Sequence, residues 1–120
     1  MKVFVYFNLR KKVFSVKALE GAEKGLVVAH RKQLIVDRAE FVVSEAGRQR
    51  VLRDQRKNVH AGVRGHWAPY IDGSSDWADL TPVTYDPYLY STFVEKTTLV
   101  PVHTARFVVL DNKRIFAELD

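Results

Sequence analysis

The chain of 120 residues contains no cysteine, which excludes a disulfide framework and a thiolate metal site. With only four prolines, it has no Pro-rich linker long enough to separate two domains. No apolar run approaches the roughly 18–20 residues that span a bilayer, and the short alternating N-terminal stretch is unlike a signal peptide. These absences predict a soluble intracellular protein with a single domain over residues 1–120.

Acidic residues are almost absent from the stretch RQRVLRDQRKNVHAGVRGH, residues 48–66. It contains six of the chain's 19 Lys and Arg residues and one acid, Asp54, so its net charge of +5 equals that of the whole chain. Residues 1–18 carry five basic residues and no acid, whereas residues 70–95 carry five acids and no Lys or Arg. This segregation of charge favours an anionic partner for the basic part of the chain.

Alternating apolar residues predict antiparallel strands, and one segment departs from that period. Residues 2–9 and 13–19 are expected to form one hairpin, and residues 105–110 and 114–119 a second. Ser44 is suited to cap a helix over residues 44–56 that lies on the surface of the sheet. Shorter strands are expected at residues 26–30, 33–36, 40–43 and 91–94. Residues 58–67 are expected to form a strand or a ligand-contacting loop, and residues 68–82 a loop. The predicted fold class is α+β, with one main helix and a mostly antiparallel, curved sheet that could close towards a barrel.

The basic stretch predicts a site for phosphate. Arginine binds phosphate oxygens bidentately, lysine acts as a point charge, and glycine lets backbone N–H groups come close. Asn58 and His60 add directional hydrogen bonds to the four cations that we expect to neutralise phosphate, which are Arg53, Arg56, Lys57 and Arg64. A solvated basic helix followed by a turn is the alternative interpretation.

The acidic part of the chain is also rich in aromatic residues. Pro87 and Asp86 favour a turn in the segment YDPYLY, residues 85–90. Its aromatic side chains could stack on a nucleobase, or pack in the core or between subunits of a homo-oligomer. The candidates for stacking are Tyr85, Tyr88 and Tyr90, and the same group includes Tyr70, Trp77 and Phe93.

The four histidines have no spacing typical of a metal site, and His60 and His66 are poorly placed as a ligand pair. His60, beside Lys57 and Arg64, could act as a general acid–base on a phosphodiester, but no second catalytic group accompanies it. The sequence therefore predicts a binding protein without a metal, a cofactor or an enzymatic activity.

The segments RKNVHAGV (residues 56–63) and YDPY (residues 85–88), with MKVFVYFNLRKKVFSVKALEG ahead of them, resemble a family of small proteins encoded by tailed bacteriophages. The resemblance covers most of the chain, except residues 68–80, and brings no catalytic residues with it. It implies a non-structural accessory protein that acts in the host cytoplasm, in host takeover, nucleic-acid handling or evasion of host immunity.

We therefore expect a protein that binds a small phosphate-bearing ligand. In the sharpest version of this hypothesis, the protein sequesters a nucleotide signal of host immunity. Two other hypotheses stay open. The first is a DNA- or RNA-binding module for host takeover, whose phosphate contacts would give a steep dependence on salt. The second is a protein inhibitor of a host defence factor.

Overall fold

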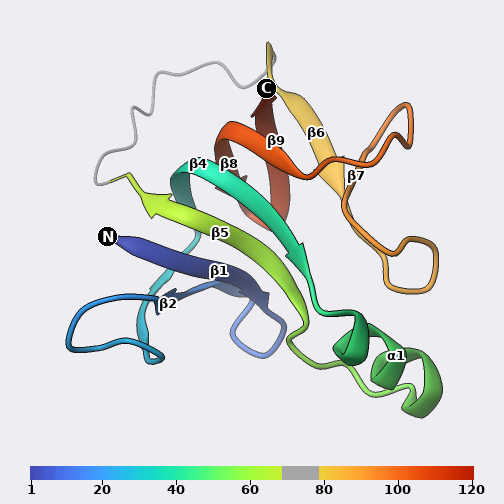
Figure 1. Ribbon diagram of the computed structural model, residues 1–120, viewed down its shortest axis with the longest axis horizontal. Helices are drawn as coiled ribbons and strands as arrows, with labels where there is room; N and C mark the ends of the chain where they lie inside the picture. The colour runs from blue at the N-terminus through green and yellow to red at the C-terminus, as the bar shows by residue number, and fades with distance from the viewer. Residues whose placement is uncertain (69–78) are drawn as a thin grey trace.

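The computed structural model describes residues 1–68 and 79–120, so most of the predicted loop at 68–82, with Tyr70 and Trp77, lies outside the described residues. Within them, nine strands form one antiparallel sheet in the order β3-β2-β1-β5-β4-β8-β9-β6-β7 (Figure 1). The elements are β1 Lys2–Asn8, β2 Val13–Ala18, β3 Val27–Arg31, β4 Gln33–Val43, α1 Glu45–Asp54, β5 Ala61–Trp67, β6 Thr81–Thr84, β7 Val94–Glu95, β8 Thr104–Asp111 and β9 Arg114–Leu119. The predicted α+β class with a mostly antiparallel sheet is confirmed.

Both predicted hairpins are present, and local turn chemistry explains each. In the β1–β2 hairpin, the side chain of Asn8 accepts hydrogen bonds from the backbone N–H groups of Arg10 and Lys11 at 3.0 and 2.9 Å. In the β8–β9 hairpin, Asn112 and Lys113 have φ of 48° and 75°. Two successive left-handed residues give the turn whose twist matches that of the flanking strands.

The strands predicted at residues 33–36 and 40–43 are one continuous strand, β4, so that division was wrong. The apolar alternation breaks because β4 contains a bulge, where Arg38 and Ala39 lie opposite the single residue Gly65 of β5. Arg38 has a φ of 49°, in the left-handed region. A bulge of this kind bends a strand and increases its twist.

One loop prediction and one further strand prediction were also wrong. Pro82 was expected in a loop, but this residue lies in β6, where it pairs with Phe116 of β9 and its carbonyl accepts from the N–H of Lys96 at 2.9 Å. The strand predicted at residues 91–94 is the two-residue β7, Val94–Glu95.

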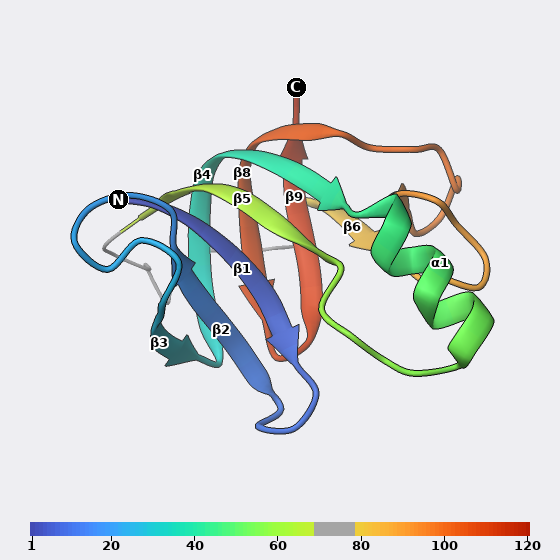
Figure 2. The ribbon, with the colours of Figure 1, turned by 60° about the horizontal axis from the view of Figure 1, so that its bottom comes forward.

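The bent sheet curls around its own core (Figure 2). Buried side chains from the two ends of the strand order belong to one apolar cluster, in which Val3 and Val16 pack with Val83, Val108 and Ala117. The sheet does not close into a barrel, because β3 and β7 are its two edges and do not pair with each other. The cluster therefore lies on the concave face of the sheet, which we call the inner face, and the opposite face is the outer face.

The predicted helix is confirmed as α1, but its expected position is not. The Ser44 hydroxyl accepts a hydrogen bond from the N–H of Gly47 at 3.2 Å, and Gln55 ends the helix with a φ of 54°. Only Gly47 and Val51 of α1 are buried. Figure 1 shows α1 beyond the end of β4, not across the sheet. In the described part of the chain, no helix has the length and apolar character that crossing a membrane requires.

A matched pair of leucines tests the position of the core. Leu110 is 1% exposed and Leu99 is 51% exposed. We expect Leu110→Ala to lower the free energy of unfolding by about 2–5 kcal/mol, because it leaves a cavity in the core. Leu99→Ala should change it by less than about 0.5 kcal/mol. Urea unfolding followed by circular dichroism measures both, and equal effects would contradict the assigned core.

Candidate ligand-binding hollow on the outer face of the sheet

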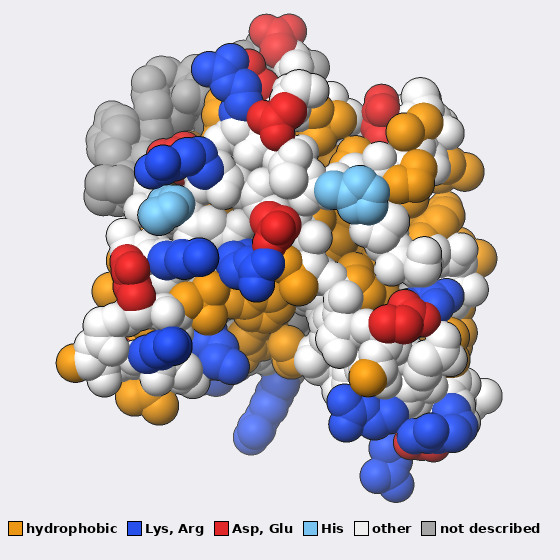
Figure 3. Space-filling model, viewed as in Figure 1, with side chains coloured by type: hydrophobic (Ala, Val, Ile, Leu, Met, Phe, Trp, Pro, Cys, Tyr) orange, Lys and Arg blue, Asp and Glu red, His pale blue; other side chains and the backbone are white. Residues whose placement is uncertain are grey.

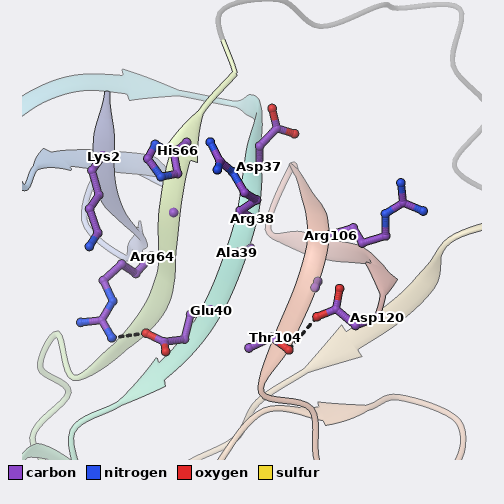
Figure 4. A pocket seen from close by; sticks show the side chains of 12 residues that line it. Lys2, Asp37, Arg38, Ala39, Glu40, Arg64, His66, Thr104, Arg106 and Asp120 are labelled. Atoms are coloured by element: carbon purple, nitrogen blue, oxygen red, sulfur yellow. Dashed lines mark hydrogen bonds and ion pairs between the residues drawn. The ribbon is translucent and has the colours of Figure 1, made fainter.

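A shallow hollow of about 710 Å³ lies on the outer face, over β1, β5, β4 and β8. In Figure 3, Lys and Arg side chains gather on this face around a hydrophobic patch over β1 and β5. Figure 4 shows the polar side chains of the hollow, with Lys2, Arg64 and His66 on neighbouring strands and Thr104 and Asp120 on the opposite side. The charged or polar lining residues are Lys2, Asp37, Arg38, Glu40, Arg64, His66, Thr104, Arg106 and Asp120.

The bulge in β4 shapes this hollow, and Gly65 makes the bulge possible. A Cβ atom on Gly65 would lie 2.7 Å from the carbonyl oxygen of Asp37 and 2.7 Å from a methyl group of Val36. Only glycine therefore lets the two backbones approach so closely. The bulge brings the exposed Arg38 to the wall of the hollow.

Ion pairs hold part of the lining in place. The guanidinium of Arg64 pairs with the carboxylate of Glu40, and the two side chains are 43% and 47% exposed. The hydroxyl of Thr104 donates to Asp120 at 2.8 Å. Arg106 lies 3.6 Å from Glu118 of β9. The hollow therefore has a cationic side, on β1 and β5, and a mixed side, on β8 and β9, where Asp120 accepts hydrogen bonds and Arg106 is cationic.

Of the nine binding residues expected from the sequence, Arg64 is the one that lines the hollow. Arg53 is exposed at the end of α1, where a hydrogen bond to Asp54 at 3.1 Å raises its pKa. Arg56, Lys57 and Asn58 are exposed in the connection between α1 and β5. These four residues therefore form a separate basic surface at the end of α1.

His60 and Tyr85, which the sequence assigned to ligand contacts, contact each other. The Nε2 atom of His60 lies 2.8 Å from the hydroxyl of Tyr85, and its Nδ1 atom lies 3.1 Å from the carbonyl oxygen of Asn58. Since a carbonyl only accepts, Nδ1 carries a proton, and in the neutral ring Tyr85 then donates to Nε2. Both ring nitrogens of His60 are thus engaged. The ring of Tyr85 stacks on the buried Phe93, with centroids 5.0 Å apart.

Arg48 holds the segment 85–90 against α1, a role that the sequence did not reveal. Its Nε atom donates to the carbonyl oxygens of Pro87 and Tyr90 at 3.0 and 2.9 Å. Its Nη1 atom lies 3.1 Å from Glu45, and the Arg48 side chain is only 16% exposed. Hydrogen bonds to Gln49 and Arg48 lower the pKa of Glu45. Tyr88, with 55% exposure, projects from the attached segment.

The structure also identifies lining residues that sequence reasoning missed, namely Lys2, Arg38 and His66. Lys2 and His66 are directly opposite each other in the β1–β5 register, and His66 is opposite Asp37 in the β5–β4 register. The alternation of β1 and β5 was the available signal, because it assigned these side chains to the outer face. Which strands are neighbours was not visible in the sequence.

Two further observations on the described residues concern a serine nucleophile and a metal site. The hydroxyl of Ser15 lies 3.0 Å from Nδ1 of His30, but Ser15 is fully buried and is inaccessible as a nucleophile. Among residues 1–68 and 79–120, no three His, Asp or Glu side chains are close enough together to hold a metal ion.

The comparisons with known proteins identify a phage protein. Residues 1–118 match the family model described as Mycobacterium phage L5 gene 82 protein. The chain therefore belongs to this family, which confirms the expected resemblance to a phage family. The Gene 82 protein of Mycobacterium phage L5 is 36% identical to it over 123 residues, which cover 98% of this chain and 95% of that protein. No solved structure matches the chain.

Removing the Arg48 side chain should release the segment 85–90. We expect Arg48→Ala to lower the free energy of unfolding by about 1–3 kcal/mol, because two carbonyl groups lose their donor. Hydrogen exchange of the Leu89 and Tyr90 amides should become faster. Arg50→Ala, an exposed arginine of the same helix, should leave both properties unchanged. Equal exchange in the two variants would show that Arg48 does not hold the segment.

The environment of Tyr85 predicts a loss of stability at high pH. Burial raises the pKa of Tyr85 above its ordinary value of 10.0, although the nearby Arg48 opposes this shift. The folded state therefore retains the phenolic proton more strongly than the unfolded state. This contribution to stability is present below about pH 10 and is lost as the pH rises through the folded-state pKa. Urea unfolding between pH 9 and 11 should show a steeper loss in the natural protein than in Tyr85→Phe, and equal slopes would contradict the prediction.

Proposed function

We propose that this phage protein binds a phosphate-bearing ligand in the hollow on the outer face, without catalysing a reaction on it. The observation that supports this proposal is that Lys2, Arg38 and Arg64, from three neighbouring strands, line one hollow together with His66. Cations from adjacent strands can contact several oxygens of one phosphate group. The pair between Arg64 and Glu40 orients the guanidinium and leaves other N–H donors for phosphate.

Carboxylates that line the hollow favour a nucleotide over inorganic phosphate. Asp37 and Asp120 carry carboxylates that would repel a second phosphate but accept hydrogen bonds from a sugar hydroxyl or a base amino group. A nucleotide signal of host immunity, sequestered in the host cytoplasm, is a ligand of this class. Membership of a phage family is consistent with such a role.

The basic surface at the end of α1 supports a second candidate, a protein inhibitor that covers an acidic surface of a host defence factor. Arg53, Arg56 and Lys57 are exposed there, and Val59, which follows them, is 59% exposed. Charged side chains around an apolar residue are suited to a protein partner, because charge complementarity steers association. Alanine at Arg56 and Lys57 would weaken this interaction and leave the hollow intact.

The proposal is tested with ATP and cyclic di-AMP by isothermal titration calorimetry. We expect at least one of them to bind, and the double variant Lys2→Gln, Arg64→Gln to bind about ten-fold more weakly or worse, because a hydrogen bond between charged groups contributes about 1.5–3 kcal/mol. The variant should stay folded, since the partly exposed Arg64–Glu40 pair adds little stability. Arg114→Gln, at the opposite end of β9 from Asp120, is the matched control.

Native mass spectrometry of the protein from infected cells extends this test to unknown ligands. A bound nucleotide that is lost from the double variant and retained by Arg114→Gln would support the proposal. The same spectrum gives the number of subunits and so checks the predicted homo-oligomer. Protein that carries no nucleotide, together with calorimetry in which neither ligand binds, would contradict the proposed function.

A further inference from the structure

Two aromatic side chains on β1 face outward, where an antiparallel sheet normally carries polar groups. Val3 and Val5 of the same strand are buried in the core, so alternation places Phe4 and Tyr6 on the outer face. Both are half-buried, and their ring centroids are 6.1 Å apart with an angle of 31° between the planes. The hydrophobic patch over β1 and β5 in Figure 3 lies among Lys and Arg side chains.

The lack of a side chain at Gly62 of β5 leaves room for the Phe4 ring. A Cβ atom at Gly62 would lie 2.6 Å from Cζ and 2.9 Å from Cε1 of Phe4. The ring therefore lies over the backbone of β5, where any larger residue would displace it. A ring supported in this way loses little conformational freedom when a ligand stacks on it.

Cations flank these rings across the sheet. Phe4 is opposite Lys17 of β2 and also opposite Arg64 of β5, so one row across three strands reads Lys17, Phe4, Arg64. Neighbouring strands are about 4.8 Å apart, so a cationic residue is next to Phe4 on each side, and the guanidinium of Arg64 also pairs with Glu40. Lys2 and His66 form the next row towards the hollow. Aromatic rings between cations are suited to an unpaired base and the phosphates beside it.

We propose that the outer face binds single-stranded nucleic acid, with bases stacked on Phe4 and Tyr6 and phosphates on Lys17, Arg64 and Lys2. This inference rests on the proposed phosphate site and names its ligand. The hollow is shallow, so a small nucleotide meets protein on one side only, whereas a strand adds contacts along β1. Duplex DNA does not fit this arrangement, because its bases are stacked inside the helix and cannot reach the rings.

The test is fluorescence anisotropy with labelled oligo-dT and oligo-U of about 12 nucleotides, within the roughly 4–16 that one sheet-based module covers. We expect Phe4→Leu and Tyr6→Leu each to weaken binding by about ten-fold, from lost stacking with the apolar area largely kept. Phe116→Leu, which changes a half-buried ring under Arg114 on β9, should bind like the natural protein. Lys17→Gln should reduce the slope of log K against log salt by about one.

The outcomes separate this inference from the proposed function. If Phe4→Leu and Tyr6→Leu bind the oligonucleotides as the natural protein does, or a duplex of the same length binds equally well, the stacking surface is wrong. If ATP or cyclic di-AMP binds in the hollow and no single strand binds, the phosphate site stands and the single-strand inference fails. If no oligonucleotide or nucleotide binds, both fail.

Discussion

The bend of β4 at its bulge is the constraint on which the rest of the structure depends. β4 is the middle strand of the sheet, with β3, β2, β1 and β5 on one side and β8, β9, β6 and β7 on the other. Arg38 adopts a left-handed conformation there, and Gly65 lets the two backbones come together. The bend turns the two halves towards one apolar cluster on the inner face, and the same bulge brings Arg38 to the hollow on the outer face. One local distortion therefore shapes both the core and the candidate site.

Features that depend on neighbours in the sequence could be predicted, and those that depend on distant residues could not. Both hairpins and the helix with its Ser44 cap follow from local alternation and turn chemistry. The continuity of β4 was missed because the partner of its bulge, Gly65, is 27 residues from Arg38 in the chain. The hollow was missed for a related reason. Its cations lie far apart in the sequence, and only the order of the strands brings Lys2 beside His66 and Arg64.

The basic stretch that dominates the sequence divides into three roles in the structure. Arg48 binds two carbonyl groups of the segment 85–90, about 40 residues away, and His60 binds Tyr85 in the same segment. Arg64 lines the hollow, whereas Arg56 and Lys57 remain exposed at the end of α1. The density of charge along a sequence thus shows how many cations are present. It does not show how many of them make contacts within the fold and how many are free to bind a ligand. Some residues of the two segments that the sequence assigned to ligand binding, 48–66 and 85–90, therefore bind each other instead.

The openness of the outer face follows from how this small chain forms its core. Most sheets bury one face against a second layer of helices or strands. This sheet instead curls on itself, and α1 lies beyond the end of β4, so within the described residues no helix covers β1 and β5. Outward aromatic rings such as Phe4 and Tyr6 would be covered only if a further layer packed on the outer face. On an open face they remain partly exposed apolar surface, whose burial by a ligand is favourable. Since the inner face of this sheet encloses the core, the outer face stays accessible to a ligand.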